Sequence, residues 1–363
     1  MSNLEKYKNA LSPLAFQAEK TQGRKITAQN QDELYDDDIP LFNCMNPFKV
    51  DLIKLVNSKD YRRLSYKTQV FPVPSNPHIR TRIQHTIEVM ALAVSAAKIL
   101  GLNSDLCQAI AFGHDIGHAP FGHFGENFIT KNSGKLFRHN INGVVVAQEI
   151  ERKGGGLNLS FETLLGILLH SRTNDKDLTF TPDVAEEYNL IMLADKIAFV
   201  FSDYNDAKRF GLIKEPNDSK VKIFGLRQRA RVICCLEALA QESAEKGHLS
   251  FFDSEIAQSF TAFRNWLYDN VYAKIDFSLQ ERMLDQVINY LSAEKFFADC
   301  DPFLVLSLLT DIEVFQFADL CKSGRQPNLA EISNFGIMEI TPFLRGKNID
   351  FAQANLSWVK KII

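Results

Sequence analysis

The chain has 363 residues, of which 45% are hydrophobic, and its 41 Lys and Arg against 44 Asp and Glu leave a formal net charge of −3. This length and apolar content suffice for one large core or two moderate ones. The near balance of charge excludes a general nucleic-acid binder, which would carry a surplus of cations, but it is compatible with a local basic pocket. No bulk polyanion partner is therefore implied.

Cysteine spacing and the N-terminal sequence indicate the compartment. The six cysteines are scattered without paired or metal-ligand spacing, which argues against a zinc ribbon or a disulfide framework. The first residues lack the basic-then-apolar profile of a signal peptide, and no apolar run approaches the length of a membrane span. We therefore expect a cytoplasmic protein with no membrane partner.

Helix signals dominate the first half of the chain, and strand signals are few and short. Apolar residues recur at spacings of three and four over residues 81–100, and Gly101 follows as a C-terminal stop. A second helix is predicted over residues 104–113, which places His114 and Asp115 at its frayed end. Further helices are predicted over residues 121–130 and 138–152, and from Ser160 as an N-cap through Leu169.

The clearest helix start in the chain is Thr181-Pro182-Asp183, an N-cap followed by proline at the first helical position. That helix would run, straight or kinked, to Gly211. Residues 214–220 are interpreted as a linker, residues 221–321 as several helices and residues 334–363 as irregular. We predict an all-α fold, with a core and N-terminal arm over residues 1–213 and a helical C-terminal region over residues 214–363 packed on the core.

Histidines gather in one part of the chain. Seven of the eight lie between residues 78 and 170, and His114, His118 and His123 fall within ten residues, together with Asp115 and two glycines. Each buried imidazole needs a partner and each glycine weakens a helix, so this segment is a poor packing solution. We interpret it as a functional site.

A metal site is predicted from His85, His114, Asp115 and Asp195. Asp195 lies in an apolar stretch, where a carboxylate is costly to bury without a cation. Two neutral imidazoles and two carboxylates cancel the charge of one divalent ion and leave positions for water and a substrate oxygen. The alternative is that His85 makes a core hydrogen bond and Asp195 pairs with Lys196 on the surface.

The order His85, His114-Asp115, Asp195 resembles the HD superfamily of metal-dependent phosphohydrolases. The extended segment 114–126 is similar to its dGTPase-like branch, the deoxynucleoside triphosphate triphosphohydrolases. Segments 61–72, 80–89, 137–140, 156–159 and 194–198 support that resemblance, which covers roughly residues 10 to 211. It implies an HD-domain helical core with a helical C-terminal extension.

The resemblance also implies a reaction. Such enzymes hydrolyse a dNTP at the α-phosphorus to the deoxynucleoside and tripolyphosphate, with dGTP our first candidate. The metal would be Mn²⁺ or Mg²⁺, with Fe²⁺ or another transition metal left open. His123 would give a proton to the 5′ oxygen, and Glu126, three residues on, would hold its imidazole. His139 and His118 would donate to phosphate oxygens, with a helix-capping or ligand-supporting hydrogen bond as the alternative for His118.

Phosphate and sugar contacts are likewise implied by the resemblance. Arg82 and Lys196 match phosphate-binding positions, although Lys196 departs from the acidic residue usual in bacterial members. Gln69 and Asp203 match positions that contact the 3′ hydroxyl. Val70 matches the residue that packs on the sugar where a ribose would place its 2′ hydroxyl.

Two departures concern the same helix face. Phe199 replaces the usual tyrosine and Ser202 the usual histidine, so a ring remains for stacking while a hydroxyl donor is lost. Substrate preference or dependence on an activator would then differ. Other basic residues are interpreted as surface or structural groups: Arg62, Arg63, Lys67, His78 and His170.

Two other functions stay open on the sequence alone. One keeps the HD site but changes the substrate, as in a 5′-nucleotidase or an alarmone hydrolase. The other is a nucleotide-binding regulatory protein with little turnover. Beyond the dNTP substrate, an activating dNTP or a single-stranded nucleic acid is an open partner, and we expect a homo-oligomer of unspecified size.

Overall fold

The computed structural model describes residues 3–26, 39–42, 44–71, 78–171, 178–213, 218–321 and 324–359. In these ranges the regular elements are helices and no strand is formed. Two isolated antiparallel bridges pair Arg24 with Ser160 and Thr68 with Thr81. The all-α prediction is therefore confirmed.

The α-helices in chain order are α1 (Ile39–Phe42), α2 (Pro47–Val56), α3 (Lys59–Arg63), α4 (Arg82–Leu100), α5 (Ser104–Gly113), α6 (His123–Ser133), α7 (His139–Val145), α8 (Glu151–Gly154), α9 (Phe161–Leu169), α10 (Glu186–Arg209), α11 (Asp218–Lys222), α12 (Gln228–Lys246), α13 (Glu255–Asn270), α14 (Ser278–Ala293), α15 (Pro302–Ser307), α16 (Asp311–Leu320) and α17 (Gly336–Leu344). Short 3₁₀ turns are η1 (Asn3–Tyr7), η2 (Ser12–Leu14), η3 (Ala18–Lys20), η5 (Leu64–Tyr66), η7 (Tyr272–Lys274) and η8 (Lys295–Phe297), and η6 (Val146–Ile150) is a π-helical turn.

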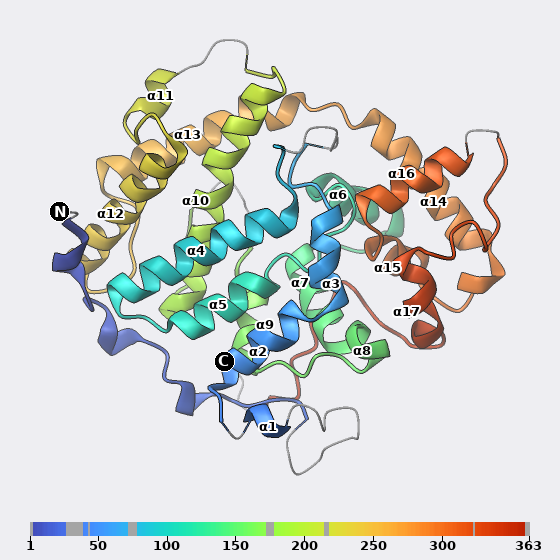
Figure 1. The fold of residues 1–363 in the computed structure, drawn as a ribbon, viewed down its shortest axis with the longest axis horizontal. Coiled ribbons are helices and arrows are strands. Elements are labelled where there is room, and N and C mark those ends of the chain that lie inside the picture. Colours follow the sequence, from blue (N-terminus) through green and yellow to red (C-terminus); the bar gives the residue numbers. More distant parts are fainter. Residues whose placement is uncertain are drawn as a thin grey trace.

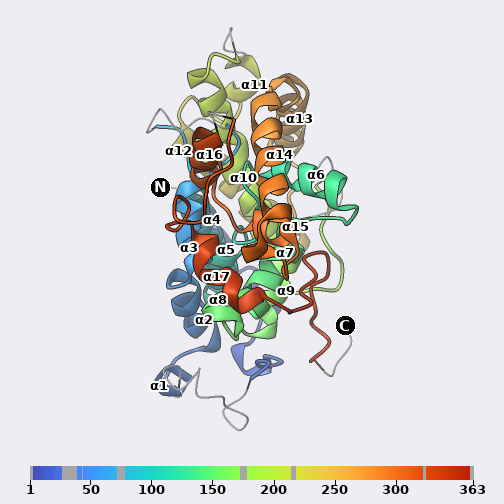
Figure 2. The same ribbon diagram turned by 90° about the vertical axis from the view of Figure 1, so that its right-hand side faces the viewer.

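Helices α4, α5 and α10 form the centre of the molecule and pack against one another (Figure 1). Helices α11–α13 cover one end of this centre, and α14–α17, in orange and red, gather at the other (Figures 1 and 2). Two hydrophobic clusters result, one with α4, α10, α12 and α13 and one with α7, α9 and α14–α17. Each cluster draws residues from both sides of residue 213, and the division of the chain there stays a prediction.

Local capping explains where the central helices begin and end. The Thr81 backbone N–H donates to the Gln84 side chain, 3.0 Å away, at the start of α4, and Gly101 ends that helix with φ +83°. The Asn103 side chain accepts from two backbone N–H groups at the start of α5. The Ser160 hydroxyl accepts from Thr163 N, as predicted for the N-cap of α9.

Helix α4 is long and apolar enough to qualify as a membrane span by length and composition, contrary to the expectation that no segment approaches that length. Its apolar residues are explained by its place in the core, where it packs against α5, α10 and α12. The same helix carries Arg82 and His85, both buried, into the interior. A core helix surrounded by other helices has the same composition as a short span.

The helix start predicted at Thr181 is wrong. Helix α10 begins at Glu186, and Asp183 has a left-handed backbone with φ +56°. The Thr181 backbone is held instead by the Asn189 side chain, which accepts from its N–H at 2.8 Å and donates to its carbonyl at 3.0 Å. A tertiary contact thus uses the groups that a cap would have needed.

Three other boundaries differ from the predictions. The helix expected over residues 138–152 is interrupted by η6 and a kink with left-handed Arg152 and Lys153. Part of the expected linker forms α11, while residues 214–217 lie outside the described residues. The tail expected to be irregular contains α17, and residues 360–363 lie outside the described residues.

Candidate active site

A cavity of about 580 Å³ lies among α4, α6, α7, α10 and the segment after α13. Its volume falls in the range of small-molecule sites. All but one of the predicted site residues line it: Gln69, Val70, Arg82, His85, Asp115, His118, His123, Glu126, His139, Asp195, Lys196, Phe199 and Asp203. The exception, His114, is fully buried next to Asp115.

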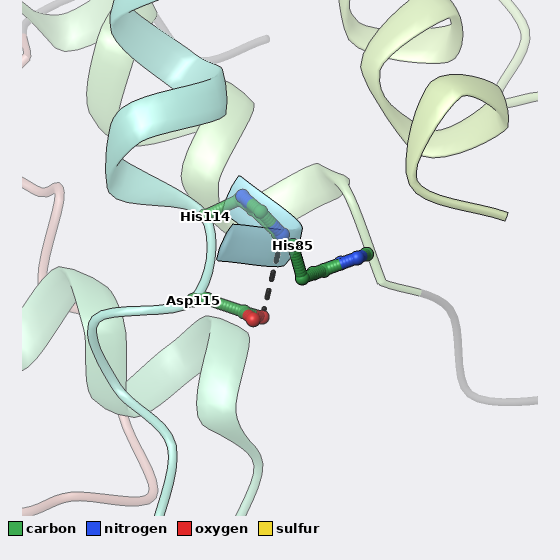
Figure 3. A group of neighbouring side chains, drawn as sticks. All are labelled: His85, His114 and Asp115. Carbon is green, nitrogen blue, oxygen red and sulfur yellow. Dashed lines mark ion pairs between the residues drawn. The ribbon is translucent and has the colours of Figure 1, made fainter. Parts of the chain in front are cut away.

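The four predicted metal ligands meet at the wall of this cavity. His85 projects from α4, His114 and Asp115 follow the last residue of α5, and Asp195 lies in the middle of α10. His85 Nε2 is 2.9 Å from Asp195 Oδ1, and His114 Nε2 is 3.4 Å from Asp115 Oδ1 and 3.9 Å from Asp195 Oδ1. In Figure 3, His114 and Asp115 extend toward one point, where their ion pair is drawn, and His85 lies beside them.

The donor atoms fit a divalent cation. His114 Nδ1 lies 2.7 Å from the Ala111 carbonyl oxygen and must donate to it, so Nε2 bears a lone pair. That Nε2 is buried without a hydrogen-bond partner and faces two carboxylates. Acceptors directed at one another repel unless a cation lies between them. The buried atoms of His85, His114 and Asp115 lie within 4.8 Å of one another, close enough to share an ion.

Charges at this wall match that interpretation. Burial lowers the pKa of His114, which keeps the imidazole neutral as a ligand requires. Burial opposes the charge of Asp195, but neighbouring Lys196 and the hydrogen bond from His85 hold the pKa of Asp195 well below its ordinary value. Burial likewise opposes the charge of Asp115, but His114, His118 and Arg82 together outweigh it, so the pKa of Asp115 also falls well below its ordinary value. Both carboxylates are thus ionised.

Glu126 organises a second cluster of imidazoles. Its Oε1 is 2.9 Å from His139 Nδ1, 2.9 Å from His118 Nδ1 and 3.3 Å from His123 Nδ1, although the His118 atom is not aligned for a hydrogen bond. The His118 and His139 rings stack at 3.8 Å. Burial, reinforced by the charge of Arg82, lowers the pKa of His118 to about 3, so His118 is neutral. The side chain of His123 is 62% exposed and lies at the edge of the cavity, where it is accessible to a ligand.

His170 is buried and hydrogen-bonded within this cluster, and its interpretation as a structural histidine stays a prediction. Its Nδ1 is 2.6 Å from the Ile167 carbonyl oxygen, so its Nε2 accepts the hydrogen bond from His139 Nε2 at 3.0 Å. His139 Nδ1 lies 2.9 Å from Glu126 Oε1, and the carboxylate can only accept, so His139 links Glu126 to His170.

A close approach of two backbones brings these clusters together. A Cβ on Gly117 would lie 2.1 Å from Gly143 N and 2.2 Å from the His139 carbonyl oxygen. Only glycine fits between the segment that follows Asp115 and helix α7. The glycine in the histidine-rich segment therefore sets the position of His139, a role that its sequence neighbours do not indicate.

Arg82 and Lys196 lie at the cavity with their charges already engaged. Arg82 donates to Asp115 Oδ2 at 3.0 Å and to the Gln69 carbonyl oxygen at 3.1 Å. Lys196 Nζ is 3.5 Å from Asp195 Oδ2 and lies over the ring of Phe199. Both cations therefore adjoin the predicted metal ligands.

Asp203 and Gln69, predicted to contact the sugar, also line the cavity. Asp203 accepts from the Tyr272 hydroxyl at 2.7 Å, and burial raises the pKa of Asp203 to about 7 despite that bond. The Gln69 side-chain oxygen is buried without a hydrogen-bond partner. Val70 and Phe199 are partly buried and pack against the first hydrophobic cluster. The polar Asp203 and Gln69 and the apolar Val70 and Phe199 thus line the same cavity.

Sequence reasoning missed the part of the cavity that follows residue 213. Tyr268, Tyr272, Ile275 and Phe277 line it from the end of α13 and the segment after it. The spacing of four between the two tyrosines was a helical-face signal, but nothing local connects it with residues near His85. Lys67, interpreted as surface or structural, is buried and structural.

Comparison with known proteins agrees with this geometry. The HD domain family matches residues 82–199. A deoxyguanosinetriphosphate triphosphohydrolase-like protein of Caldanaerobacter subterraneus subsp. tengcongensis is 35% identical over 287 residues, 77% of this chain and 79% of that protein. A protein of the same description from Clostridium tetani is 34% identical over 302 residues, 80% of this chain and 82% of its own length.

Two further matches complete this comparison. A deoxyguanosinetriphosphate triphosphohydrolase-like protein from an Azoarcus species is 40% identical over 197 residues, 50% of this chain and 52% of that protein. Among solved structures, a hypothetical protein from Aquifex aeolicus matches with a TM-score of 0.44 and 17% identity, over 78% of this chain and 70% of that one. With 35% identity across more than three quarters of both chains, this protein belongs to the family of HD-domain, deoxyguanosinetriphosphate triphosphohydrolase-like proteins.

Proposed function

We propose that the protein hydrolyses deoxynucleoside triphosphates at the α-phosphorus, releasing the deoxynucleoside and tripolyphosphate, with dGTP as the first substrate to test. The observation that carries this proposal is one cavity lined by three kinds of group. These are the predicted metal ligands, the histidines around Glu126, and the polar and apolar side chains assigned to the sugar. The names of the relatives support a triphosphohydrolase of this kind.

His85, His114, Asp115 and Asp195 would hold a divalent metal, with Mn²⁺ or Mg²⁺ our proposal, which would supply Lewis acidity and an activated water when bound. His123 is suited to give a proton to the departing 5′ oxygen because it lines the cavity and Glu126 faces its Nδ1 at 3.3 Å. Without such a proton the leaving group would depart as an alkoxide.

The remaining clusters bind the substrate. Arg82 and Lys196 provide two cations beside the predicted ligands, which suit a chain of phosphates, and His139 lines the same cavity. We assign the 3′ hydroxyl to Asp203 and Gln69. Val70 offers no partner to a 2′ hydroxyl, so a ribonucleotide would bury an unsatisfied group and lose roughly 5- to 150-fold in kcat/KM.

Product analysis tests the proposal. The protein is incubated with Mn²⁺ and each dNTP, alone and in pairs, and products are separated by anion exchange. We expect deoxynucleoside and tripolyphosphate, and a loss of about 10²-fold or more in turnover for His123→Ala with metal content retained. Orthophosphate or pyrophosphate as the first product would assign the chain to another HD activity. Activation by a second dNTP would appear only in the paired incubations.

A further inference from the structure

Helix α16 hydrogen-bonds two segments that line the cavity or adjoin its lining through one buried carboxylate, and its Phe315 ring packs against Phe121. Asp311, the first residue of α16, is fully buried and accepts from Thr68 N at 2.9 Å, from Thr68 Oγ1 at 2.5 Å and from Phe121 N at 2.9 Å. A capping box of Thr310 and Glu313 fixes the start of the helix. The carboxylate thus joins two segments that are 243 and 190 residues away in the sequence.

Both of these segments continue directly into the cavity. Thr68 precedes Gln69 and Val70, which line the cavity and which we assign to sugar binding. Phe121 lies two residues before His123 and lines the cavity itself.

The backbone on the His123 side is also strained. Phe121 and Gly122 have φ values of +60° and +58°, a conformation that costs a non-glycine residue free energy and persists only where surrounding contacts enforce it. The bond from Phe121 N to Asp311 is such a contact.

Lys67 strengthens the same connection. Its buried ammonium donates to the His118 carbonyl oxygen and, at 3.4 Å, to the Ser307 carbonyl oxygen of α15. Burial lowers the pKa of Lys67 to about 8 and raises the pKa of Asp311, and each group's charge offsets part of the cost of burying the other. Through these hydrogen bonds, the Lys67 ammonium and the Asp311 carboxylate hold residues 67–68 and 118–121 to α15 and α16.

We propose that Asp311, supported by Lys67, is a positioning residue that fixes the spacing between the sugar-contacting segment Gln69–Val70 and the acid-bearing segment 118–123. This inference rests on the proposed function. Its consequence is that α15 and α16 govern both turnover and the choice of sugar, although neither helix supplies a residue to the cavity lining. The predicted metal ligands lie on α4, on α10 and directly after α5, and they should be retained without this contact.

The experiment compares Asp311→Ala and Asp311→Asn with Glu313→Gln in the full-length protein. Glu313 is a matched control because it begins the same helix, where it bonds Thr310 and Gly336 but neither cavity segment. Metal content, melting temperature, kcat, KM, and the ratio of kcat/KM for dGTP to that for GTP are measured for each. A displacement of about 1 Å at a reacting centre costs on the order of 10²-fold in rate.

We expect the Asp311 variants to keep their metal, to lose about 10- to 100-fold in kcat/KM for dGTP, and to discriminate less against GTP. Glu313→Gln should lower the melting temperature and leave the dGTP to GTP ratio unchanged. The proposal is overturned if all variants lose activity in step with melting temperature at a constant ratio. Where Asp311→Ala does not fold, Thr68→Val removes the hydroxyl bond from the other side and is judged by the same ratio.

Amide hydrogen exchange separates this inference from the proposed function. Asp311→Asn should speed exchange at both 68–70 and 118–123, and Glu313→Gln at neither. If the wild type hydrolyses no dNTP, the proposed function fails while exchange still decides whether Asp311 positions the segments. Unchanged exchange in the Asp311 variants overturns the positioning role whatever the activity.

Discussion

Asp195 brings the long helix α10 to the predicted metal ligands, and its carboxylate lies 2.9 Å from His85 and 3.9 Å from His114. We expect Asp195→Ala to weaken metal binding at least about 10-fold, because three ligands leave the ion underneutralised. Elemental analysis of the purified proteins measures this. Asp203→Asn is the control, since it removes a buried carboxylate from the same helix outside the ligand set. Equal metal in the wild type and Asp195→Ala would refute the assignment.

Asp203 gives a pH-dependent prediction. Its pKa is raised from 3.8 to about 7 by burial, against the hydrogen bond from Tyr272 and the charges of His85 and Arg80, while Asp206 adds to the rise. Between pH values of about 4 and about 7, Asp203 keeps its proton in the folded protein and has lost it in the unfolded chain. The free energy of unfolding therefore falls as pH rises from about 4 to about 7, by at most about 4 kcal/mol.

The substitution Asp203→Asn isolates this effect, because asparagine can still accept from Tyr272 and does not ionise. Near pH 4, we expect the free energies of unfolding of the two proteins to differ little in their pH dependence. Toward pH 7, the variant should become more stable relative to the wild type. Urea unfolding of both proteins at several pH values measures the difference. Parallel stability curves for the two proteins would mean that Asp203 titrates near its ordinary value.

At the scale of elements, the contact of the histidine-rich segment with α7 depends on Gly117. We expect Gly117→Ala to push α7 away, since the new Cβ would lie 2.1 Å from Gly143 N, and to cost about 1 to 3 kcal/mol or more of unfolding free energy. Turnover should fall as well because His139 leaves Glu126. Gly336→Ala is the matched control, at a helix start where the nearest atoms are 3.5 Å from the added Cβ. Equal unfolding midpoints for the two variants would contradict the close approach.

The periodic helices were predictable at this scale and their interruptions were not. Residues 82–100 and 104–113 form α4 and α5 close to where their periodicity and caps placed them. The start at Thr181 failed because Asn189 bonds to the backbone that the cap needed. Local patterns report a residue's own backbone preferences, whereas a tertiary hydrogen bond can override them.

At the scale of the whole molecule, the two tryptophans report on the two hydrophobic clusters separately. Trp266 packs against the first cluster and Trp358 against the second, where its Nε1 donates to Gln148 Oε1 at 2.9 Å. Ile83 of α4 and Phe112 of α5 pack against the second cluster, and both clusters draw on both sides of residue 213. We therefore expect Trp266→Phe and Trp358→Phe, each leaving a single reporter, to show fluorescence transitions in urea with the same wild-type-like m value and cooperativity.

The measurement is repeated by far-ultraviolet circular dichroism on each variant. Within a variant, fluorescence and dichroism midpoints should coincide if the chain unfolds as one unit. A fluorescence transition that precedes the dichroism transition in one variant would show that its cluster unfolds independently, and would favour two domains.

The sequence by itself determined the helical class, the ends of the central helices and the residues His85, His114, Asp115 and Asp195 as candidates for one site. These follow from information that is local: apolar periodicity, capping side chains and residue types with a distinctive cost of burial. The family resemblance added the expected reaction.

Only the tertiary structure decided which distant groups join them. His170 lies 31 residues beyond His139 and contacts it, and Asp311 lies 190 residues beyond Phe121 and holds its backbone. Neither residue has a distinctive local pattern, because their positions result from packing between helices that the sequence separates widely. Side-chain chemistry can therefore be inferred one residue at a time, whereas the approach of two segments is decided by the packing of the whole chain.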